Sequence, residues 1–129
     1  MHLFLDAGQG NILAFFEITG VKEMDRDRNT PAWVQHIAFQ LETEDALISA
    51  KKDLEEKGLE VLGITEHGII RSIYFFDPNG HRLELTCITG TEEQMAELKK
   101  VAPEMLEEWS KTKKPPRQAS WLHDKQFKK

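Results

Sequence analysis

Residues 69–88 constrain the fold more than any other part of this chain. Residues 69–76 are rich in β-branched and aromatic side chains, and residues 82–88 resume an alternating apolar pattern. Between them, Asp-Pro-Asn-Gly at 77–80 supplies a proline that suits a turn and a glycine that accepts positive φ. The segment therefore predicts two antiparallel strands joined by a tight turn.

Each predicted strand has one apolar face and one mixed face, because side chains alternate along a strand. Residues 33–41 show the same alternation. The simplest interpretation is a sheet whose apolar face is covered by a helix and whose mixed face lines a cavity. The mixed face collects His36, Ala38, Gln40, Ser72, Tyr74, Phe76, Arg82, Glu84 and Thr86.

A covering helix is predicted directly after residue 42. Thr43 can cap its start, acidic residues follow in the first turn, apolar residues recur at helical spacing, and Lys57 with Gly58 marks the end. Residues 59–64 give a further short strand. The predicted order over 33–88 is therefore β-α-β-β-β, an α+β fold.

This order and these residues resemble the vicinal oxygen chelate superfamily, which includes glyoxalases, bleomycin resistance proteins and extradiol ring-cleaving dioxygenases. His-Ile-Ala-Phe at 36–39 is similar to the family's first-strand metal histidine, and Arg-Leu-Glu-Leu at 82–85 to its metal carboxylate. Residues 65–84 also resemble the extradiol dioxygenase signature: Thr-x-His, five residues, Ile-Tyr, two residues, Asp-Pro-x-Gly and a final Glu.

The resemblance implies a role for each of four residues. His36 and Glu84 would bind a divalent metal, His67 would be the acid or base of the pocket, and Tyr74 would contact a substrate oxygen. Fe(II) is the favoured metal, because non-haem oxygenases hold iron through two histidines and one carboxylate. Mn, Ni and Zn are the alternatives. Such a triad needs one more ligand, for which His2, a partner subunit or water are the candidates.

The family builds its site from two modules, and this chain is expected to hold one complete module and part of another. Residues 1–18 resemble the terminal hairpin of an incomplete first module, and residues 33–90 the complete βαβββ module. Residues 19–32 are the expected connector and residues 91–129 a helical C-terminal extension, all within one structural domain. When Gly10 is laid against Gly80, Ala14 falls at the place of Glu84. The missing half of the pocket favours a homodimer.

The C-terminal extension begins with a helix signal. Thr91 and Gln94 have capping-box spacing, and Pro103 is predicted to interrupt the helix and to begin a second one. Beyond a basic run, apolar anchors are expected to pack on the same subunit or on a partner: Trp121, Leu122 and Phe127.

Each candidate also has a simpler interpretation. His36 could be a partly buried histidine with a hydrogen-bond partner, and Glu84 could pair with Arg82 or Arg71 across the hairpin. Tyr74 could be a sheet aromatic with its hydroxyl at the rim, and His67 a loop residue without a role.

Composition describes an ordinary globular chain of 129 residues, 40% hydrophobic and 30% charged. It has no apolar run long enough to span a membrane and no signal-peptide pattern, so a cytoplasmic protein without membrane association is expected. The net charge of -5 argues against nucleic-acid binding. The single cysteine, Cys87, excludes an internal disulfide, and its place on the apolar face predicts a buried thiol.

Three functional hypotheses follow. The leading one is a metal-dependent oxidoreductase resembling extradiol dioxygenases and acting on a small bidentate oxygen substrate. The alternatives are a glyoxalase-like lyase or isomerase and a non-catalytic ligand-binding protein of the bleomycin resistance type. Metal content separates the enzyme hypotheses from the binding protein.

Overall fold

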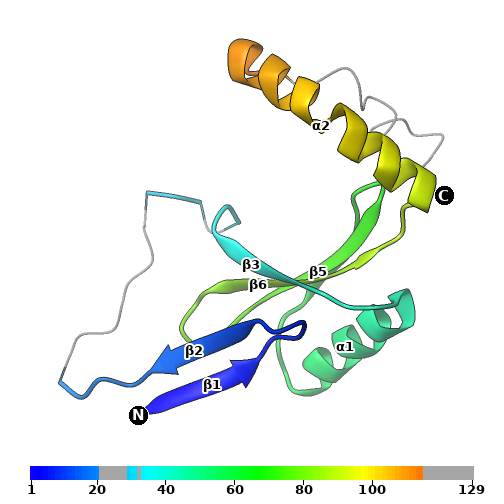
Figure 1. Ribbon diagram of the computed structural model, residues 1–129. Coiled ribbons are helices and arrows are strands. Elements are labelled where there is room, and N and C mark those ends of the chain that lie inside the picture. Colours follow the sequence, from blue (N-terminus) through cyan, green and yellow to red (C-terminus); the bar gives the residue numbers. More distant parts are fainter. Residues whose placement is uncertain (21–28, 32, 115–129) are drawn as a thin grey trace. The chain divides into compact units, whose positions relative to one another are not determined.

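The computed structural model describes residues 1–20, 29–31 and 33–114. Its compact units are Met1–Gln35 and His36–Lys129. The expected connector lies largely outside the described residues, as do the anchors Trp121, Leu122 and Phe127. In chain order the elements are β1 (His2–Asp6), β2 (Ile12–Phe16), β3 (His36–Gln40), α1 (Glu44–Glu56), β4 (Leu62–Glu66), β5 (Ile70–Phe76), β6 (Arg82–Ile88) and α2 (Glu92–Thr112) (Figure 1).

The first unit is an antiparallel hairpin of β1 and β2. The pairing runs from His2 opposite Phe16 to Asp6 opposite Ile12. The Asp6 carboxylate accepts the backbone N–H of Gly8 at 2.8 Å, which fixes the glycine-rich turn. Apolar side chains of this hairpin are exposed on both faces: Leu3, Phe4, Leu5, Ile12, Phe15 and Phe16.

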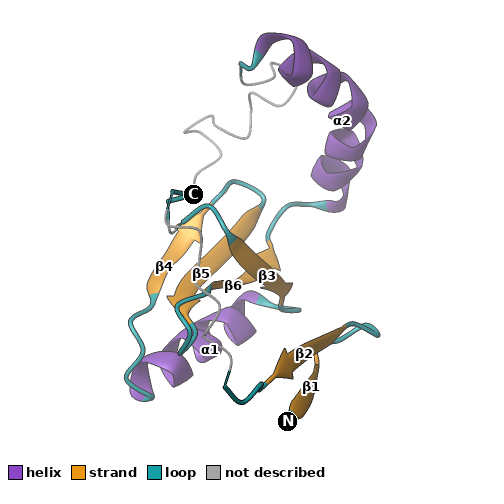
Figure 2. Ribbon diagram, turned by 90° about the vertical axis from the view of Figure 1, so that its left-hand side faces the viewer, coloured by secondary structure: helices purple, strands orange, loops and turns teal. Residues whose placement is uncertain are grey.

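The second unit contains a four-stranded sheet in the order β3-β6-β5-β4 (Figure 2). β3 runs parallel to β6, and the other neighbours are antiparallel. With α1 between β3 and β4, the chain order is β-α-β-β-β. The predicted α+β architecture is therefore confirmed.

Local signals fix both ends of α1. The Thr43 hydroxyl accepts the backbone N–H of Ala46 at 3.1 Å, and Glu44 and Asp45 lie in the first turn, where the helix dipole favours negative charge. The helix ends at Lys57, followed by Gly58 with φ of 83°. These are the boundaries that the sequence predicts.

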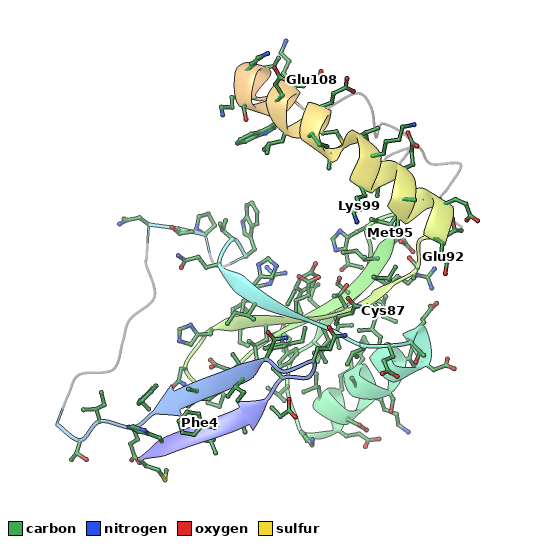
Figure 3. All side chains as sticks on the ribbon, viewed as in Figure 1. Phe4, Cys87, Glu92, Met95, Lys99 and Glu108 are labelled. Atoms are coloured by element: carbon green, nitrogen blue, oxygen red, sulfur yellow. The ribbon has the colours of Figure 1, made fainter. Side chains whose placement is uncertain are left out.

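The core lies between α1 and the apolar face of the sheet. Leu47, Ile73 and Cys87 are fully buried there. Cys87, labelled in Figure 3, is thus the buried thiol that its strand position predicts, and burial raises its pKa. Around these three pack Leu41, Ala50, Leu54, Val61 and Leu85. Burial of each large apolar side chain contributes roughly 1.5–3 kcal/mol, so this layer holds the sheet in place.

The register of β5, β6 and β3 confirms the predicted alternation and arranges the mixed face in three cross-strand rows. Row one is Phe76, Arg82 and His36; row two is Tyr74, Glu84 and Ala38; row three is Ser72, Thr86 and Gln40. Residues in one row lie directly opposite each other and share a face.

Two local predictions are wrong. α2 continues through Pro103, where an interruption was predicted. Proline removes a single backbone hydrogen bond, here to the carbonyl of Lys99, and the capping box of Thr91 and Gln94 secures the first turn, so the helix persists. The strand predicted at 59–64 spans Leu62–Glu66 and carries a register irregularity.

α2 is amphipathic in sequence, yet none of its residues is fully buried. Its side chains, including Glu92, Met95, Lys99 and Glu108, surround the helix in Figure 3. Among the described residues, no helix is long and apolar enough to cross a membrane.

Candidate metal site

The structure brings His36 and Glu84 into direct contact. Nε2 of His36 lies 2.9 Å from Oε2 of Glu84. The contact exists because the parallel pairing of β3 with β6 places His36 opposite Arg82 and one row from Glu84. Glu84 is only 6% exposed, whereas the side chain of His36 is 30% exposed. A carboxylate so buried requires a polar or charged partner, and the imidazole provides one.

The donor set fits a divalent metal. Two ligands at right angles, each about 2.1 Å from one ion, stand roughly 3 Å apart, which matches the observed spacing. An imidazole nitrogen and a carboxylate oxygen are suitable donors for Fe(II), Mn, Ni or Zn. Within the described part of the chain, no third His, Cys, Asp or Glu joins them in a group able to hold an ion. An ion held by His36 and Glu84 therefore needs a further ligand from outside this group.

Tyr74 and His67 lie next to this pair. Tyr74 is directly opposite Glu84 in the β5–β6 ladder, and its ring meets that of His36 edge to face with centroids 5.9 Å apart. Nε2 of His67, in the turn between β4 and β5, lies 2.8 Å from the Tyr74 hydroxyl. All four residues that the resemblance singles out thus lie in one cluster.

The environment of Tyr74 keeps its phenol protonated. Burial raises the pKa of Tyr74, and the negative charge of Glu84 raises it further, against the lowering effects of a hydrogen bond with Ser72 and the charge of Arg82. At neutral pH the hydroxyl is therefore neutral. It can donate a hydrogen bond to a substrate oxygen or exchange one with His67.

Two row-three residues, Ser72 and Thr86, form a chain of hydrogen bonds next to row two. Ser72 is fully buried, and its hydroxyl donates to the Thr86 hydroxyl at 3.1 Å. Thr86 in turn donates to the backbone carbonyl of Arg71 at 3.1 Å. This short chain satisfies two hydroxyls that would otherwise be unpaired inside the sheet.

The alternative interpretation in which Glu84 pairs with Arg82 or Arg71 is wrong. The guanidinium of Arg71 bonds Glu66, at 2.7 Å from Nε, and also Glu44 at the start of α1. Arg82 instead places its guanidinium carbon 4.3 Å from the centre of the Tyr74 ring. The alternation predicts Arg82 on the mixed face but does not indicate its contact with the ring of Tyr74.

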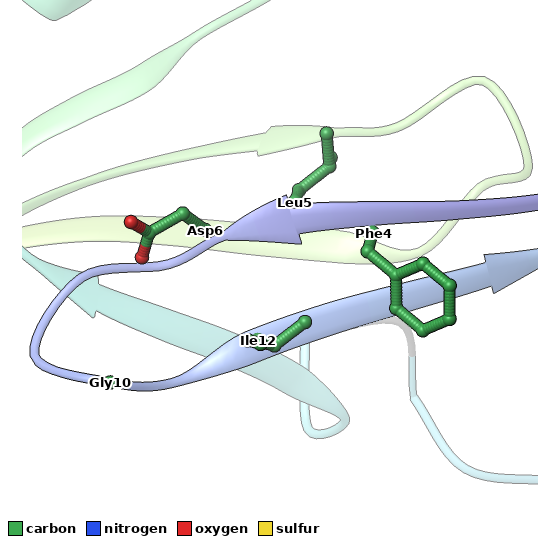
Figure 4. A pocket seen from close by; sticks show the side chains of 5 residues that line it. All are labelled: Phe4, Leu5, Asp6, Gly10 and Ile12. Atoms are coloured by element: carbon green, nitrogen blue, oxygen red, sulfur yellow. The ribbon is translucent and has the colours of Figure 1, made fainter.

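A hollow of about 340 Å³ lies on the hairpin of β1 and β2, away from these residues in sequence (Figure 4). It is lined by Phe4, Leu5, Asp6, Gly10 and Ile12. None of His36, His67, Tyr74 and Glu84 lines it. Its only ionisable side chain, Asp6, is engaged with the backbone of the turn.

The second unit is thus an α+β fold with a βαβββ order, in which a histidine and a glutamate on adjacent strands are in contact. The family model of the Glyoxalase/Bleomycin resistance protein/Dioxygenase superfamily matches residues 2–85. The chain belongs to this superfamily.

Similar proteins differ in how much of their length this chain spans. It is 35% identical over 118 residues to the metallothiol transferase FosB of Shouchella clausii (strain KSM-K16), covering 81% of this chain and 78% of that protein. It is 26% identical over 84 residues to the putative ring-cleaving dioxygenase MhqA of Bacillus subtilis (strain 168), covering 65% of this chain but only 27% of that protein.

A solved structure shares the fold. The integron cassette protein HFX_CASS4, from the mobile metagenome of the Halifax Harbour sewage outfall, matches with a TM-score of 0.50 at 29% identity. The match covers 67% of this chain and 68% of that one.

Proposed function

We propose that this protein is a divalent-metal-dependent enzyme in which His36 and Glu84 hold the metal. The observation that carries the proposal is the 2.9 Å contact between Nε2 of His36 and Oε2 of the buried Glu84, at a spacing suited to adjacent ligands of one ion. When bound, the metal supplies Lewis acidity and lowers the pKa of a coordinated hydroxyl. The substrate is a small molecule that presents neighbouring oxygens.

Tyr74 and His67 supply the proton chemistry. The Tyr74 hydroxyl, neutral at physiological pH, contacts a substrate oxygen, and His67 at 2.8 Å accepts or returns the proton. Because Tyr74 is directly opposite Glu84, the phenol is next to the chelating carboxylate. Tyr74 and His67 therefore act on the same substrate oxygens that the metal binds.

The leading reaction is oxidative ring cleavage on Fe(II). Its support is the signature-like segment at 65–84 and the similarity to the ring-cleaving dioxygenase MhqA. A second candidate is thiol transfer, favoured by one observation: the similarity to the metallothiol transferase FosB extends over 78% of that protein.

The described residues supply no third ligand to the His36–Glu84 pair, and this favours a homodimer. The β1–β2 hairpin exposes apolar side chains on both faces, among them Ile12 at 67%, and such surfaces are typical of protein interfaces. Ile12→Glu should give a monomer in analytical ultracentrifugation. Ile48→Glu, at a helix position 48% exposed, should leave the mass unchanged. A monomeric unmodified protein contradicts the dimer.

Metal content after anaerobic reconstitution tests the enzyme proposal. Stoichiometric metal is expected in the unmodified protein and in Glu56→Gln, an exposed control, with at least a tenfold loss of affinity in His36→Ala and Glu84→Gln. If no metal binds, or neither site substitution changes its uptake, the proposal is wrong.

Two assays then separate the reactions. Oxygen consumption with catechols supports ring cleavage, and consumption of a small thiol with an electrophilic acceptor supports thiol transfer. Metal binding with neither activity contradicts both reactions and directs attention to glyoxalase-like isomerisation.

A further inference from the structure

Arg82 occupies a position from which it can contact a ligand of the proposed site. It lies in row one, directly opposite His36 on β3 and Phe76 on β5. Its side chain reaches across the ring of Tyr74, with the guanidinium carbon 4.3 Å from the ring centre. Since Tyr74 shares row two with Glu84, the cation lies beside the chelating pair.

The hydrogen-bonding capacity of Arg82 is incompletely used. Its Nε is buried and has no hydrogen-bond partner among the described residues. No carboxylate in the described part of the chain forms an ion pair with it. Buried N–H groups of charged side chains nearly always have an acceptor, so this one indicates a missing partner.

Arg71 provides the comparison within the same sheet. Its Nε donates to Glu66 at 2.7 Å, and its Nη1 donates to Glu44. That arginine has the paired arrangement of a structural ion pair. Arg82 lies over the ring of Tyr74 and has no acidic partner among the described residues. This arrangement is typical of an arginine that binds an anion from outside the chain.

We propose that Arg82 binds an oxyanion, a carboxylate or a phosphonate, carried by the small molecule that chelates at His36 and Glu84. The link between the anion and the chelating oxygens rests on the proposed function. The anion itself is recognised by Arg82 alone: the guanidinium fork matches two oxygens of such a group, and stacking on Tyr74 orients the fork. The substrate class is therefore an anionic vicinal oxygen ligand.

Arginine side-chain NMR on ¹⁵N-labelled, metal-free protein tests the anion site directly. Methylphosphonate and acetate are the probes, and uncharged dimethyl methylphosphonate is the control. The Nε–H signal of Arg82, assigned by its absence in Arg82→Lys, should move saturably with one of the anions and not with the neutral ester. The Nε–H signal of Arg71 should stay in place, and calorimetry should show at least tenfold weaker anion binding in Arg82→Lys.

The same samples separate this inference from the metal proposal. Arg82→Lys should retain full metal uptake, because Arg82 is not a ligand. If the unmodified protein takes up no metal but the Arg82 signal responds, the metal proposal fails and the anion site stands. If the Arg82 signal does not respond, or moves only in parallel with that of Arg71, the anion site is overturned whatever the metal content.

Discussion

The Tyr74 hydroxyl and Nε2 of His67 are 2.8 Å apart, although one residue lies in a strand and the other in the preceding turn. His67 directly follows β4, which pairs antiparallel with β5, the strand on which Tyr74 lies. The contact gives the phenol a hydrogen-bond partner from the turn between β4 and β5.

The titration of this phenol is directly measurable, because Tyr74 is the only tyrosine of the chain. Ultraviolet titration should give a pKa above the ordinary value of about 10, since burial disfavours the phenolate. Glu84→Gln should lower that pKa by removing a nearby negative charge. A native pKa at or below the ordinary value would contradict the burial of this hydroxyl.

The raised pKa of Tyr74 also predicts how stability depends on pH. The folded state keeps the phenolic proton to higher pH than the unfolded state, so this contribution is complete below pH about 10 and is lost as the pH rises through the folded pKa. Urea unfolding should show a steeper decline above pH about 10 in the unmodified protein than in Tyr74→Phe. An equal decline of stability with pH in the two proteins would show that the ionisation of Tyr74 does not affect folding.

Metal should stabilise the fold through His36 and Glu84. A ligand that binds only the native state at a hundred times its Kd adds about 2.7 kcal/mol to the free energy of unfolding. Added Fe(II) under anaerobic conditions, or Mn(II) in air, should raise the Tm, and a chelator should reverse the change. Glu84→Gln should show no increase; an increase equal to that of the unmodified protein places the ion elsewhere.

Leu47 should dominate the stability of α1. It is fully buried and packs with Ile73 and Cys87, so Leu47→Ala should cost about 2–5 kcal/mol in chemical unfolding. Ile48→Ala, one residue along and 48% exposed, should change stability by about 0.5 kcal/mol or less. Similar losses at both positions would mean that α1 does not cover the sheet by this face.

Gly63 should tolerate no side chain. A Cβ there would lie 2.7 Å from the carbonyl oxygen of Ser72, at φ of 112°, so Gly63→Ala should destabilise by about 2–4 kcal/mol. The control is Gly80→Ala, where φ is 83° but no atom lies within 4 Å, with an expected cost of about 1–2 kcal/mol. Thermal unfolding of both variants compares the two losses of stability. Equal losses would show that the backbone near Gly63 moves to relieve the contact with the Ser72 carbonyl oxygen.

The sequence predicts the local elements well because their signals are local. Thr43 and Gly58 bracket α1, and the alternation around Tyr74 and Glu84 gives the two faces of the hairpin. The interruption predicted at Pro103 is wrong because one lost hydrogen bond does not end a helix of this length.

The site depended on information that periodicity does not contain. The contact of His36 with Glu84 joins residues 48 positions apart through the parallel pairing of β3 and β6, an arrangement that only the family resemblance implied. The contact of Arg71 with Glu44 was missed for the same reason, since the two residues are 27 positions apart. The roles of His36, Glu84, His67 and Tyr74 stay predictions that the metal and titration experiments address.

The three-row register has a consequence for how such a protein diversifies. Row one carries the cation of Arg82 beside His36, row two the carboxylate and the phenol, and row three the two hydroxyls. Because each row is set by backbone pairing, a substitution of Arg82 leaves His36 in the same row and Glu84 in row two at their places. If His36 and Glu84 hold the metal and Arg82 meets the ligand, as proposed, substrate choice and metal retention can be selected independently.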